Sequence, residues 1–334
     1  MDVSKIVKVA RLIDQDPSGV ALRLSESDGV SRQAASAMLA KLRKKGLIAT
    51  EGHGRGTTYR LLDTVSKSKS FPLAGLSEDV VWREFCAPVV ADLPDNVRNI
   101  WHHGITEMVN NAIDHSGAEN VSLTITRNAL FTEVWIRDRG EGIFLKIQRA
   151  MNLYDTREAL LELSKGKFTT DPARHSGEGI FFTSKMFDRF SILSGKLVYL
   201  HDDHPWDYLA EDSKHMDGTT VVLRLCNDST QTASEVFDRF ASPDEYSFSK
   251  TTVPVRLAQY EGEKLVSRSQ AKRLTRRFEK FRTVLLDFSG VDEIGQAFAD
   301  EVFRVFRNAH PEIEMSPLRA SPAVALMISR VSSQ

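Results

Sequence analysis

The chain has 334 residues, a formal net charge of −1 and 41% hydrophobic residues. This length is enough for two or three domains, and the near-zero charge excludes a chain that is basic or acidic as a whole. No apolar stretch is long enough to span a bilayer, and no charged segment followed by a hydrophobic one marks a secretory signal. Cys86 and Cys226 lack metal-ligand spacing, which favours two buried thiols in a reducing compartment. We therefore expect a cytoplasmic protein with no membrane contact.

The first part of the chain, residues 1–62, has the pattern of three helices followed by two short strands. Apolar residues recur at helical spacing in the first and third helices, and Ser31 is a suitable N-cap for a helix over 32–45. The glycine-rich segment 52–56 would form the tip between the two strands. Basic residues outnumber acidic ones in this part of the chain, which favours an anionic partner.

The stretch from Val30 to Ile48 has a pattern typical of one class of DNA-binding domain. It reads Val30-Ser-Arg-Gln-Ala-Ala-Ser36, followed by Leu39, Leu42 and Gly46-Leu47-Ile48, and it resembles the recognition-helix portion of winged helix-turn-helix domains. The resemblance implies DNA binding, with base edges met near the start of the third helix and phosphate or the minor groove met by the wing. The residues in those places are Ser31, Arg32, Gln33, Ser36 and, at the wing tip, Arg55.

Two further expectations concern this first domain. A single module of this kind has only modest affinity for DNA, so a homodimer is expected to accompany DNA binding. The alternative is a winged helix that contacts protein, with a basic face that is simply solvated.

The next residues, 63–71, are rich in Ser and Lys and have no hydrophobic periodicity, which is typical of a linker. The expected organisation is therefore a first domain over 1–62, a linker over 63–71, a second domain over 72–242 and a third over 245–334.

Three short signatures follow one another in the second domain. Glu107-Met-Val-Asn-Asn111-Ala-Ile-Asp-His115 lies on a predicted helix, where Glu107, Asn111 and His115 share one face. Asp138-Arg-Gly140-Glu-Gly142 follows an alternating strand over 131–137, and its glycines let the backbone turn tightly beside a ligand. Ser176-Gly177-Glu-Gly179 opens an apolar helix, whose free N-terminal amides can face phosphate. Polar side chains such as those on this face of the first helix are rarely buried in a hydrophobic core without a function. The three signatures together therefore predict a ligand-binding site.

The order and spacing of these signatures resemble the GHKL superfamily of ATPases, which includes histidine kinases, Hsp90-like chaperones, gyrase-type ATPases and anti-sigma-factor serine kinases. Gly218-Thr219-Thr220, before an alternating strand, matches the later Gly-Thr of that fold. The resemblance implies an α/β sandwich of the Bergerat type that binds ATP and Mg²⁺. Asn111 would coordinate Mg²⁺, and Asp138 would accept a hydrogen bond from the adenine amino group. The pocket and its lid would be shaped by Gly140, Gly142, Gly177 and Gly179, with Thr219 beside the aspartate.

The segment 143–176 is long and polar, and a helical portion is expected over 151–163. Long loops in compact domains are usually functional, and the resemblance implies the ATP lid in this place. Arg174 or His175, next to the glycines, would meet the terminal phosphate. The alternative for each is an exposed lid side chain.

Glu107 is the residue that bears on which reaction the site would catalyse. In the hydrolases and serine kinases of this family an acid at this helical position activates the attacking oxygen, while Mg²⁺ and positioning supply most of the stabilisation. The stretch around it resembles the anti-sigma serine kinases more than the histidine kinases, and no upstream helix pair carries an acceptor histidine. His102, His103 and His115 are expected to be structural or to line the edge of the pocket.

The last part of the chain, from about Glu245, alternates short strands with helices. Its stretch Val284 to Ile294 resembles the strand-turn of STAS domains, and the wider run to Val302 resembles STAS-like domains fused to such ATPases. The resemblance implies a protein partner. The position of the classical phosphoacceptor serine reads Ile294-Gly295-Gln296-Ala297 and offers no hydroxyl, so phosphotransfer is not expected there.

The sequence as a whole predicts a multidomain α/β protein: a winged helix, then a Bergerat-type sandwich, then a small STAS-like domain. The function expected is an ATPase switch that couples nucleotide state to DNA or partner binding. Two alternatives stay open. One is a serine/threonine protein kinase of anti-sigma type that acts on a separate partner, and the other is a scaffold that binds ATP without catalysis.

Overall fold

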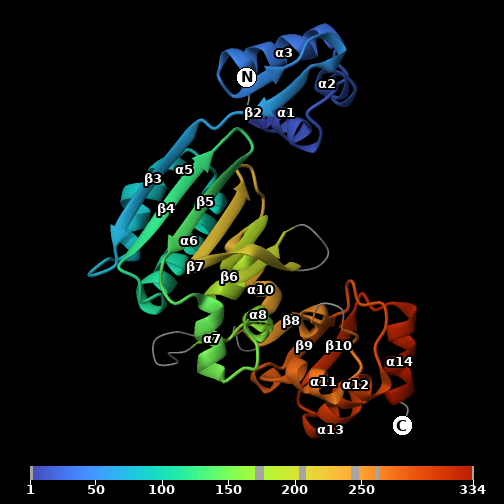
Figure 1. Ribbon diagram of the computed structural model, residues 1–334. Coiled ribbons are helices and arrows are strands. Elements are labelled where there is room, and N and C mark those ends of the chain that lie inside the picture. The colour runs from blue at the N-terminus through green and yellow to red at the C-terminus, as the bar shows by residue number, and fades with distance from the viewer. Residues whose placement is uncertain (1–2, 170–176, 203–207, 242–247, 261–262, 333–334) are drawn as a thin grey trace.

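The structure is a computed structural model that describes the chain apart from residues 1–2, 170–176, 203–207, 242–247, 261–262 and 333–334. Three bodies follow one another along the chain, and the coarse expectation of a multidomain α/β protein is confirmed (Figure 1). Within the described ranges, no helix combines the length and the apolar character that crossing a bilayer requires.

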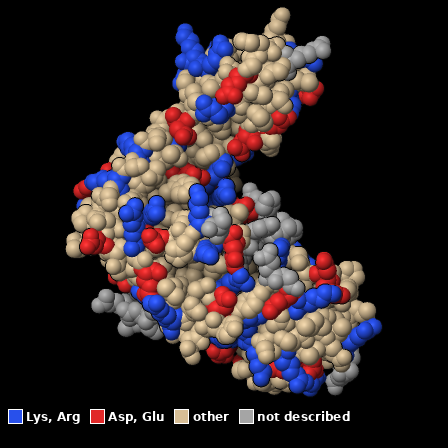
Figure 2. Space-filling view, viewed as in Figure 1, with Lys and Arg blue, Asp and Glu red and all other residues tan. Residues whose placement is uncertain are grey.

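The N-terminal domain consists of three helices and a two-stranded antiparallel sheet. Its elements are α1 (Val3–Gln15), α2 (Val20–Asp28), α3 (Arg32–Lys44), β1 (Ile48–Glu51) and β2 (Thr58–Leu61). Ser31 begins α3 as expected, because its hydroxyl accepts a hydrogen bond from the amide of Ala34 at 3.2 Å. Leu24, Leu39 and Leu42 belong to a small hydrophobic core of this domain. Lys and Arg side chains gather at the upper left of this domain in Figure 2.

The expected linker over 63–71 is wrong. Residues Val65–Pro72 form strand β3, which pairs antiparallel with β4 (Asn120–Arg127) along its whole length. β3 is an edge strand of the central sheet, and Phe71 is its one buried side chain. Because nearly all of the strand is solvated, its alternating Ser and Lys carry no hydrophobic periodicity that a sequence pattern can detect. Lysines on an edge strand also discourage pairing with a further strand.

The central domain has a five-stranded antiparallel sheet in the order β3-β4-β5-β7-β6. Its remaining strands are β5 (Phe131–Asp138), β6 (Arg189–His201) and β7 (Tyr208–Cys226). Alternate residues of β4 and β5 are buried on one face of the sheet, and helix α6 (Asp95–His115) lies against that face (Figure 1). The shorter elements before α6 are α4 (Glu78–Val81), a π-helical turn (Trp82–Cys86) and α5 (Ala87–Val90).

Two helices replace the single helical portion expected over 151–163. They are α7 (Ile143–Met151) and α8 (Thr156–Lys165). Asn152 ends α7 in a left-handed conformation (φ 50°), and the Asp155 carboxylate begins α8 by accepting from the amide of Arg157 at 2.8 Å. The expected helix over 151–163 therefore includes the residues between α7 and α8, which are not helical. The remaining helices of this domain are α9 (Gly179–Met186) and α10 (Ala233–Phe240).

The C-terminal domain has a three-stranded parallel sheet in the order β10-β9-β8. Strand β8, which the sequence pattern did not reveal, runs beside the expected strand β9. Helix α11 ends at Thr275, and Arg277 follows in a left-handed conformation (φ 67°). The elements are β8 (Lys250–Pro254), α11 (Arg268–Thr275), β9 (Thr283–Asp287), α12 (Gln296–Asp300), a π-helical turn (Glu301–Phe306), α13 (Arg307–Ala309), β10 (Glu314–Leu318) and α14 (Pro322–Ser332), with 3₁₀ turns at Val255–Ala258 and Phe278–Lys280. A further 3₁₀ turn, Gly54–Gly56, lies between the two strands of the N-terminal domain.

Candidate functional site

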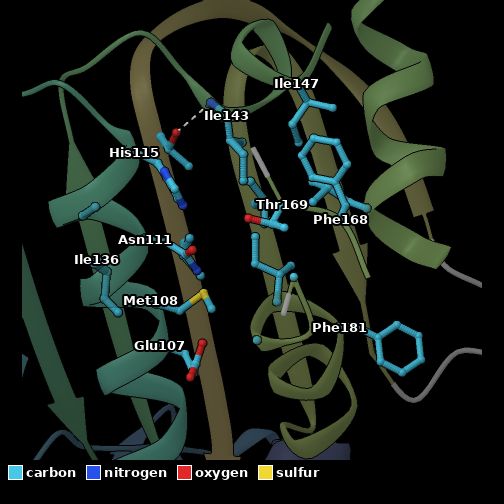
Figure 3. A pocket seen from close by; sticks show the side chains of 18 of the residues that line it. Glu107, Met108, Asn111, His115, Ile136, Ile143, Ile147, Phe168, Thr169 and Phe181 are labelled. Atoms are coloured by element: carbon cyan, nitrogen blue, oxygen red, sulfur yellow. Dashed lines mark hydrogen bonds between the residues drawn. The ribbon is translucent and has the colours of Figure 1, made fainter. Parts of the chain in front are cut away.

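A cavity of about 370 Å³ lies between α6, the sheet and the segments that contain α7 and the start of α9. This volume falls within the range of small-molecule sites. Figure 3 shows Glu107, Asn111 and His115 projecting from one face of α6, as their spacing predicts, with Phe168 and Thr169 across the cavity. The cavity lining includes most of the residues expected at the site, namely Glu107, Asn111, Asp138, Gly142, Gly177, Gly179 and Thr219.

Three expected residues have a different status. Gly140 is next to the cavity and does not line it, but its amide binds Asp138. Arg174 and His175 lie outside the residues that the structure describes.

Asp138 is the last residue of β5, and its side chain is buried. Its Oδ1 accepts hydrogen bonds from the amides of Gly140 (2.9 Å) and Thr219 (3.2 Å). Burial raises the pKa of this carboxyl group, and the two amide donors lower it to a smaller extent. Within the described part of the chain both bonds end on the same oxygen, so Oδ2 is left for a donor on a ligand in the cavity. The group is thus an oriented hydrogen-bond acceptor in the wall of the cavity.

Close approaches of the backbone build the surroundings of Asp138. A Cβ on Gly140 would lie 1.8 Å from the carbonyl oxygen of Ser116, and a Cβ on Gly218 would lie 2.3 Å from the carbonyl oxygen of Asp138. Gly218 also has a φ of 74°, which other residues rarely adopt. Any side chain at either position would push the backbone apart, so both glycines are needed for this end of the cavity.

Helix α7 is fixed against the same end of the cavity. The hydroxyl of Thr219 accepts from the amide of Ile143 at 3.0 Å, the bond drawn as a dashed line in Figure 3. The ammonium group of Lys146 donates to the carbonyl of His115 at 2.7 Å, which joins α7 to the C-terminus of α6. Sequence reasoning missed Ile143 and Lys146, because no motif separates them from the rest of a polar segment.

The opposite end of the cavity contains Glu107 and the start of α9. A Cβ on Gly179 would lie 1.9 Å from Oε2 of Glu107, so the carboxylate lies directly against the first residue of that helix. One turn along α6, the carboxamide of Asn111 makes no hydrogen bond to any described residue and faces the cavity. An acid, an amide and the positive end of a helix therefore meet at one place, where a cation and an anion can both be held.

No cluster of three or more His, Cys, Asp or Glu side chains within the described ranges is arranged to hold a metal ion. A cation at this end of the cavity would therefore need oxygen atoms from a ligand or from water in addition to Asn111. Mg²⁺ in nucleotide sites has this kind of coordination, with few protein ligands and several phosphate or water oxygens.

His103 lies in the cavity wall one turn before Glu107. Burial lowers the pKa of His103 to about 4, and the neighbouring His102 contributes to the lowering, so the ring is neutral at pH 7. It packs edge-on against Phe237, with ring centroids 5.7 Å apart. These contacts fit the expected role of a histidine that lines the edge of the pocket.

The wall opposite α6 includes Phe168, which sequence reasoning also missed. The amide of Phe168 donates to the carbonyl of Gly177 at 3.1 Å. A Cβ on Gly177 would lie 2.4 Å from the backbone of Phe168, so a side chain there would separate the two segments. Phe168 follows the end of α8 in a segment without regular structure, where a single hydrophobic residue carries no periodic signal.

The residues expected to meet DNA lie at the surface of the N-terminal domain. Ser31, Arg32, Gln33 and Ser36 are exposed at the start of α3, although the Ser31 hydroxyl is already used as the helix cap. Arg55 is in the 3₁₀ turn between the two strands, and its side chain is outside the described part of the structure. The start of α3 is therefore open to a partner.

Comparison with known proteins identifies one part of the chain. A family model, the STAS-like domain of unknown function (DUF4325), matches residues 270–325. None of the curated proteins matches the chain. The expectation of a STAS-like C-terminal domain is confirmed over the matched residues, which run from α11 into α14.

Proposed function

We propose that the central domain is a GHKL-type domain that binds ATP and Mg²⁺ in the cavity beside α6, and that the chain is a nucleotide-dependent regulator. The observation that carries the proposal is Asp138, a buried carboxylate that lines the cavity and has one oxygen fixed by two backbone amides. An exocyclic amino group is the complementary donor on an adenine ring. In a site shielded from water this bond discriminates strongly against a ligand that lacks the donor.

The phosphates of the nucleotide would lie at the other end of the cavity, against the backbone of Gly177 and Gly179 and the start of α9. Asn111 would bind Mg²⁺, which neutralises negative charge on the phosphates when it is bound. Glu107 is close enough to the same helix terminus to accept a proton from an attacking oxygen. These roles make the site an ATPase or a phosphotransferase.

The regulatory half of the proposal rests on the N-terminal domain. Three helices and a two-stranded sheet, with exposed Arg32 and Gln33 at the start of α3, suit a winged helix that binds DNA. Two copies of the chain on one DNA site would supply the affinity that a single module lacks. Nucleotide binding alters DNA binding only when ATP has different affinities for two arrangements of the domains.

The kinase alternative requires a separate acceptor. The stretch Ile294-Gly295-Gln296-Ala297 of the C-terminal domain carries no hydroxyl, so this domain offers no acceptor at the usual position. Transfer of labelled phosphate to a partner protein separates a kinase from an ATPase switch. Release of no phosphate at all, with or without DNA, favours the scaffold.

The test of the ATP site is the variant Asp138→Asn, with Glu141→Gln as the control. Asparagine keeps the size of the side chain but can present a donor to the adenine amino group, so ATP affinity should fall by about 1–3 kcal/mol. Glu141 is next to the site and pairs with Arg149, and its variant should bind like the parent. Titration calorimetry measures both, and parent-like binding by Asp138→Asn rules out the assignment.

The catalytic role is tested by Glu107→Gln. This change removes the base but keeps the shape, so ATP should still bind while phosphate release falls by about two to four orders of magnitude. Asn111→Ala should instead lose the Mg²⁺-dependent part of binding. Undiminished release by Glu107→Gln excludes Glu107 as the base.

The DNA site is tested by Arg32→Ala, with Arg98→Ala on the central domain as the control. Loss of a contact to a base or phosphate should weaken binding in a mobility-shift assay, and binding by the parent should fall with added salt. Arg98 lies on the surface and pairs with Asp95, so its loss should have no effect. Equal binding by the parent and Arg32→Ala contradicts the assignment.

A further inference from the structure

The C-terminal domain packs against α8, one of the helices that wall the cavity. Glu162 and Lys165 of α8 are fully buried at this junction. The Lys165 ammonium donates to Oε1 of Glu162 at 2.8 Å and to the carbonyls of Arg273 (3.3 Å) and Arg276 (2.9 Å). These bonds connect the end of α8 to the last turn of α11 and the residue that follows it.

Arg277 makes the most direct connection to the cavity wall. Its guanidinium donates to Oε2 of Glu162 (3.0 Å) and to the carbonyls of Gly166 (2.9 Å) and Lys167 (2.5 Å). The same group lies 5.4 Å from the ring centroid of Phe168. One buried side chain of the C-terminal domain therefore contacts three successive residues beyond the end of α8.

The backbone of Arg277 supports a positioning role. Its φ of 67° is in the left-handed region, which is unfavourable for a side chain with a Cβ. Such a conformation persists only where the surrounding contacts determine it. The fork of the guanidinium suits several acceptors at once, and a lysine cannot reproduce that geometry.

The contacts continue from Phe168 into the candidate site. Phe168 lines the cavity, and its amide donates to the carbonyl of Gly177 at 3.1 Å. Gly177 is two residues before Gly179, which lies against the carboxylate of Glu107. The path from Arg277 to the end of the cavity thus runs through Gly166, Lys167, Phe168 and Gly177.

We propose that Arg277 is a positioning residue for the cavity, through which docking of the C-terminal domain sets the place of the wall formed by Gly166 to Thr169. The identity of the ligand rests on the function proposed above. The position of the wall does not, because it is a property of the protein without ligand. Glu162 keeps Lys165 as a partner when Arg277 is changed, so the junction and the wall can be separated by mutation.

The experiment compares Arg277→Gln, Arg277→Lys and the control Arg268→Gln in the full chain. Arg268 begins α11, and its ion pairs, to Asp300 and Glu301, stay within the C-terminal domain. Hydrogen exchange of a peptide covering residues 163–169 is followed without nucleotide, and ATP affinity is measured by calorimetry. Arg277→Gln should speed exchange in this peptide and weaken ATP binding on the order of tenfold.

The variant Arg277→Lys separates the effect of the guanidinium geometry on the cavity wall from the effect of the positive charge on stability. It keeps a cation beside Glu162, so the midpoint of thermal unfolding should stay near that of the parent. It should still speed exchange in residues 163–169, because a compact ammonium group cannot reproduce the planar fork by which the guanidinium reaches the carbonyls of Gly166 and Lys167 together with the carboxylate of Glu162. Arg268→Gln should match the parent in both measurements.

The inference can still be tested if Arg277→Gln does not fold or if the parent does not bind ATP. Should Arg277→Gln fail to fold, Phe168→Leu must weaken ATP binding without changing the midpoint of unfolding, and parent-like binding overturns the inference. Should the parent bind no ATP, the proposed function fails, and hydrogen exchange alone decides the positioning role. Parent-like exchange over residues 163–169 in both Arg277 variants overturns it in every case.

Discussion

The central domain meets its two neighbours through junctions of opposite character. The N-terminal junction has two ion pairs that are partly exposed to solvent, Arg11 to Asp228 (2.7 Å) and Arg224 to Asp14 (3.6 Å). It also has a small apolar cluster formed by Val7, Ala10 and Leu130. The C-terminal junction instead buries the charged network of Glu162, Lys165 and Arg277.

The hydrophobic cores show the same contrast. The N-terminal domain has a core of its own. A single cluster continues from the central domain into the C-terminal domain, for example through Phe181 and Phe248, whose ring centroids are 4.7 Å apart. The boundary that the sequence suggests near residues 242–245 is therefore a boundary in the chain, and the packing runs across it. The N-terminal domain is built as a separable module, whereas the other two share one core.

The sharpest test of this comparison is Glu162→Ala, matched with Asp228→Ala at the other junction. Removing Glu162 leaves two buried cations without their shared carboxylate, which should lower the free energy of unfolding by about 3–5 kcal/mol. Asp228→Ala breaks an exposed pair and should cost less than about 1 kcal/mol. Urea unfolding of the full chain measures both. Similar losses at the two junctions would contradict the comparison.

A second test uses pH. Burial lowers the pKa of Lys165 from 10.5 to about 8. Between these values the unfolded chain retains the proton that the folded chain has lost, so the unfolded state binds more protons and the free energy of unfolding rises with pH. Below about pH 8 the full cost of burying the charged amine is present.

The variant Lys165→Met lacks this titration and keeps the pair between Glu162 and Arg277. Relative to it, the parent should gain on the order of 3 kcal/mol as the pH rises through the range between the two pKa values. The exposed Lys272→Met is the control and should follow the parent at every pH in this range. A constant difference between the parent and Lys165→Met would show that Lys165 does not titrate there.

The sequence predicted the parts of the fold that have a regular pattern. The polar face of α6 follows from the spacing of Glu107, Asn111 and His115, and the structure brings these residues to one cavity with Asp138. Strand β5 was predictable because one of its faces is buried and its hydrophobic residues alternate. Local chemistry was enough for these elements, while the ligand and its chemistry stay predictions.

The features that the sequence did not predict depend on contacts far apart in the chain. β3 has no hydrophobic alternation because nearly all of its side chains are exposed to solvent, so only its pairing with β4 reveals it. Glu162 and Arg277 each resemble ordinary surface charges in the sequence, although they are far apart along the chain and meet in a buried junction. Periodicity describes the face of one element, and it contains no information on which distant element covers that face.

The smallest expected effect is at the N-terminal junction. Asp14→Asn together with Asp228→Asn removes both ion pairs but leaves the cluster of Val7, Ala10 and Leu130 in place. Because exposed pairs are screened by salt and hold flexible side chains, the double variant should lower the free energy of unfolding of the full chain by less than about 1 kcal/mol, and the loss should vanish at high salt.

The same double variant should visibly change the orientation of the N-terminal domain relative to the central domain, even though the free energy of unfolding changes little. The reason is that the small apolar cluster is the main contact that remains between the two domains. Small-angle scattering at low and high salt, beside urea unfolding, measures both quantities. A parent-like scattering profile would show that the apolar cluster alone fixes the orientation of the N-terminal domain. In that case Leu130→Ala should change the scattering profile in the same assay.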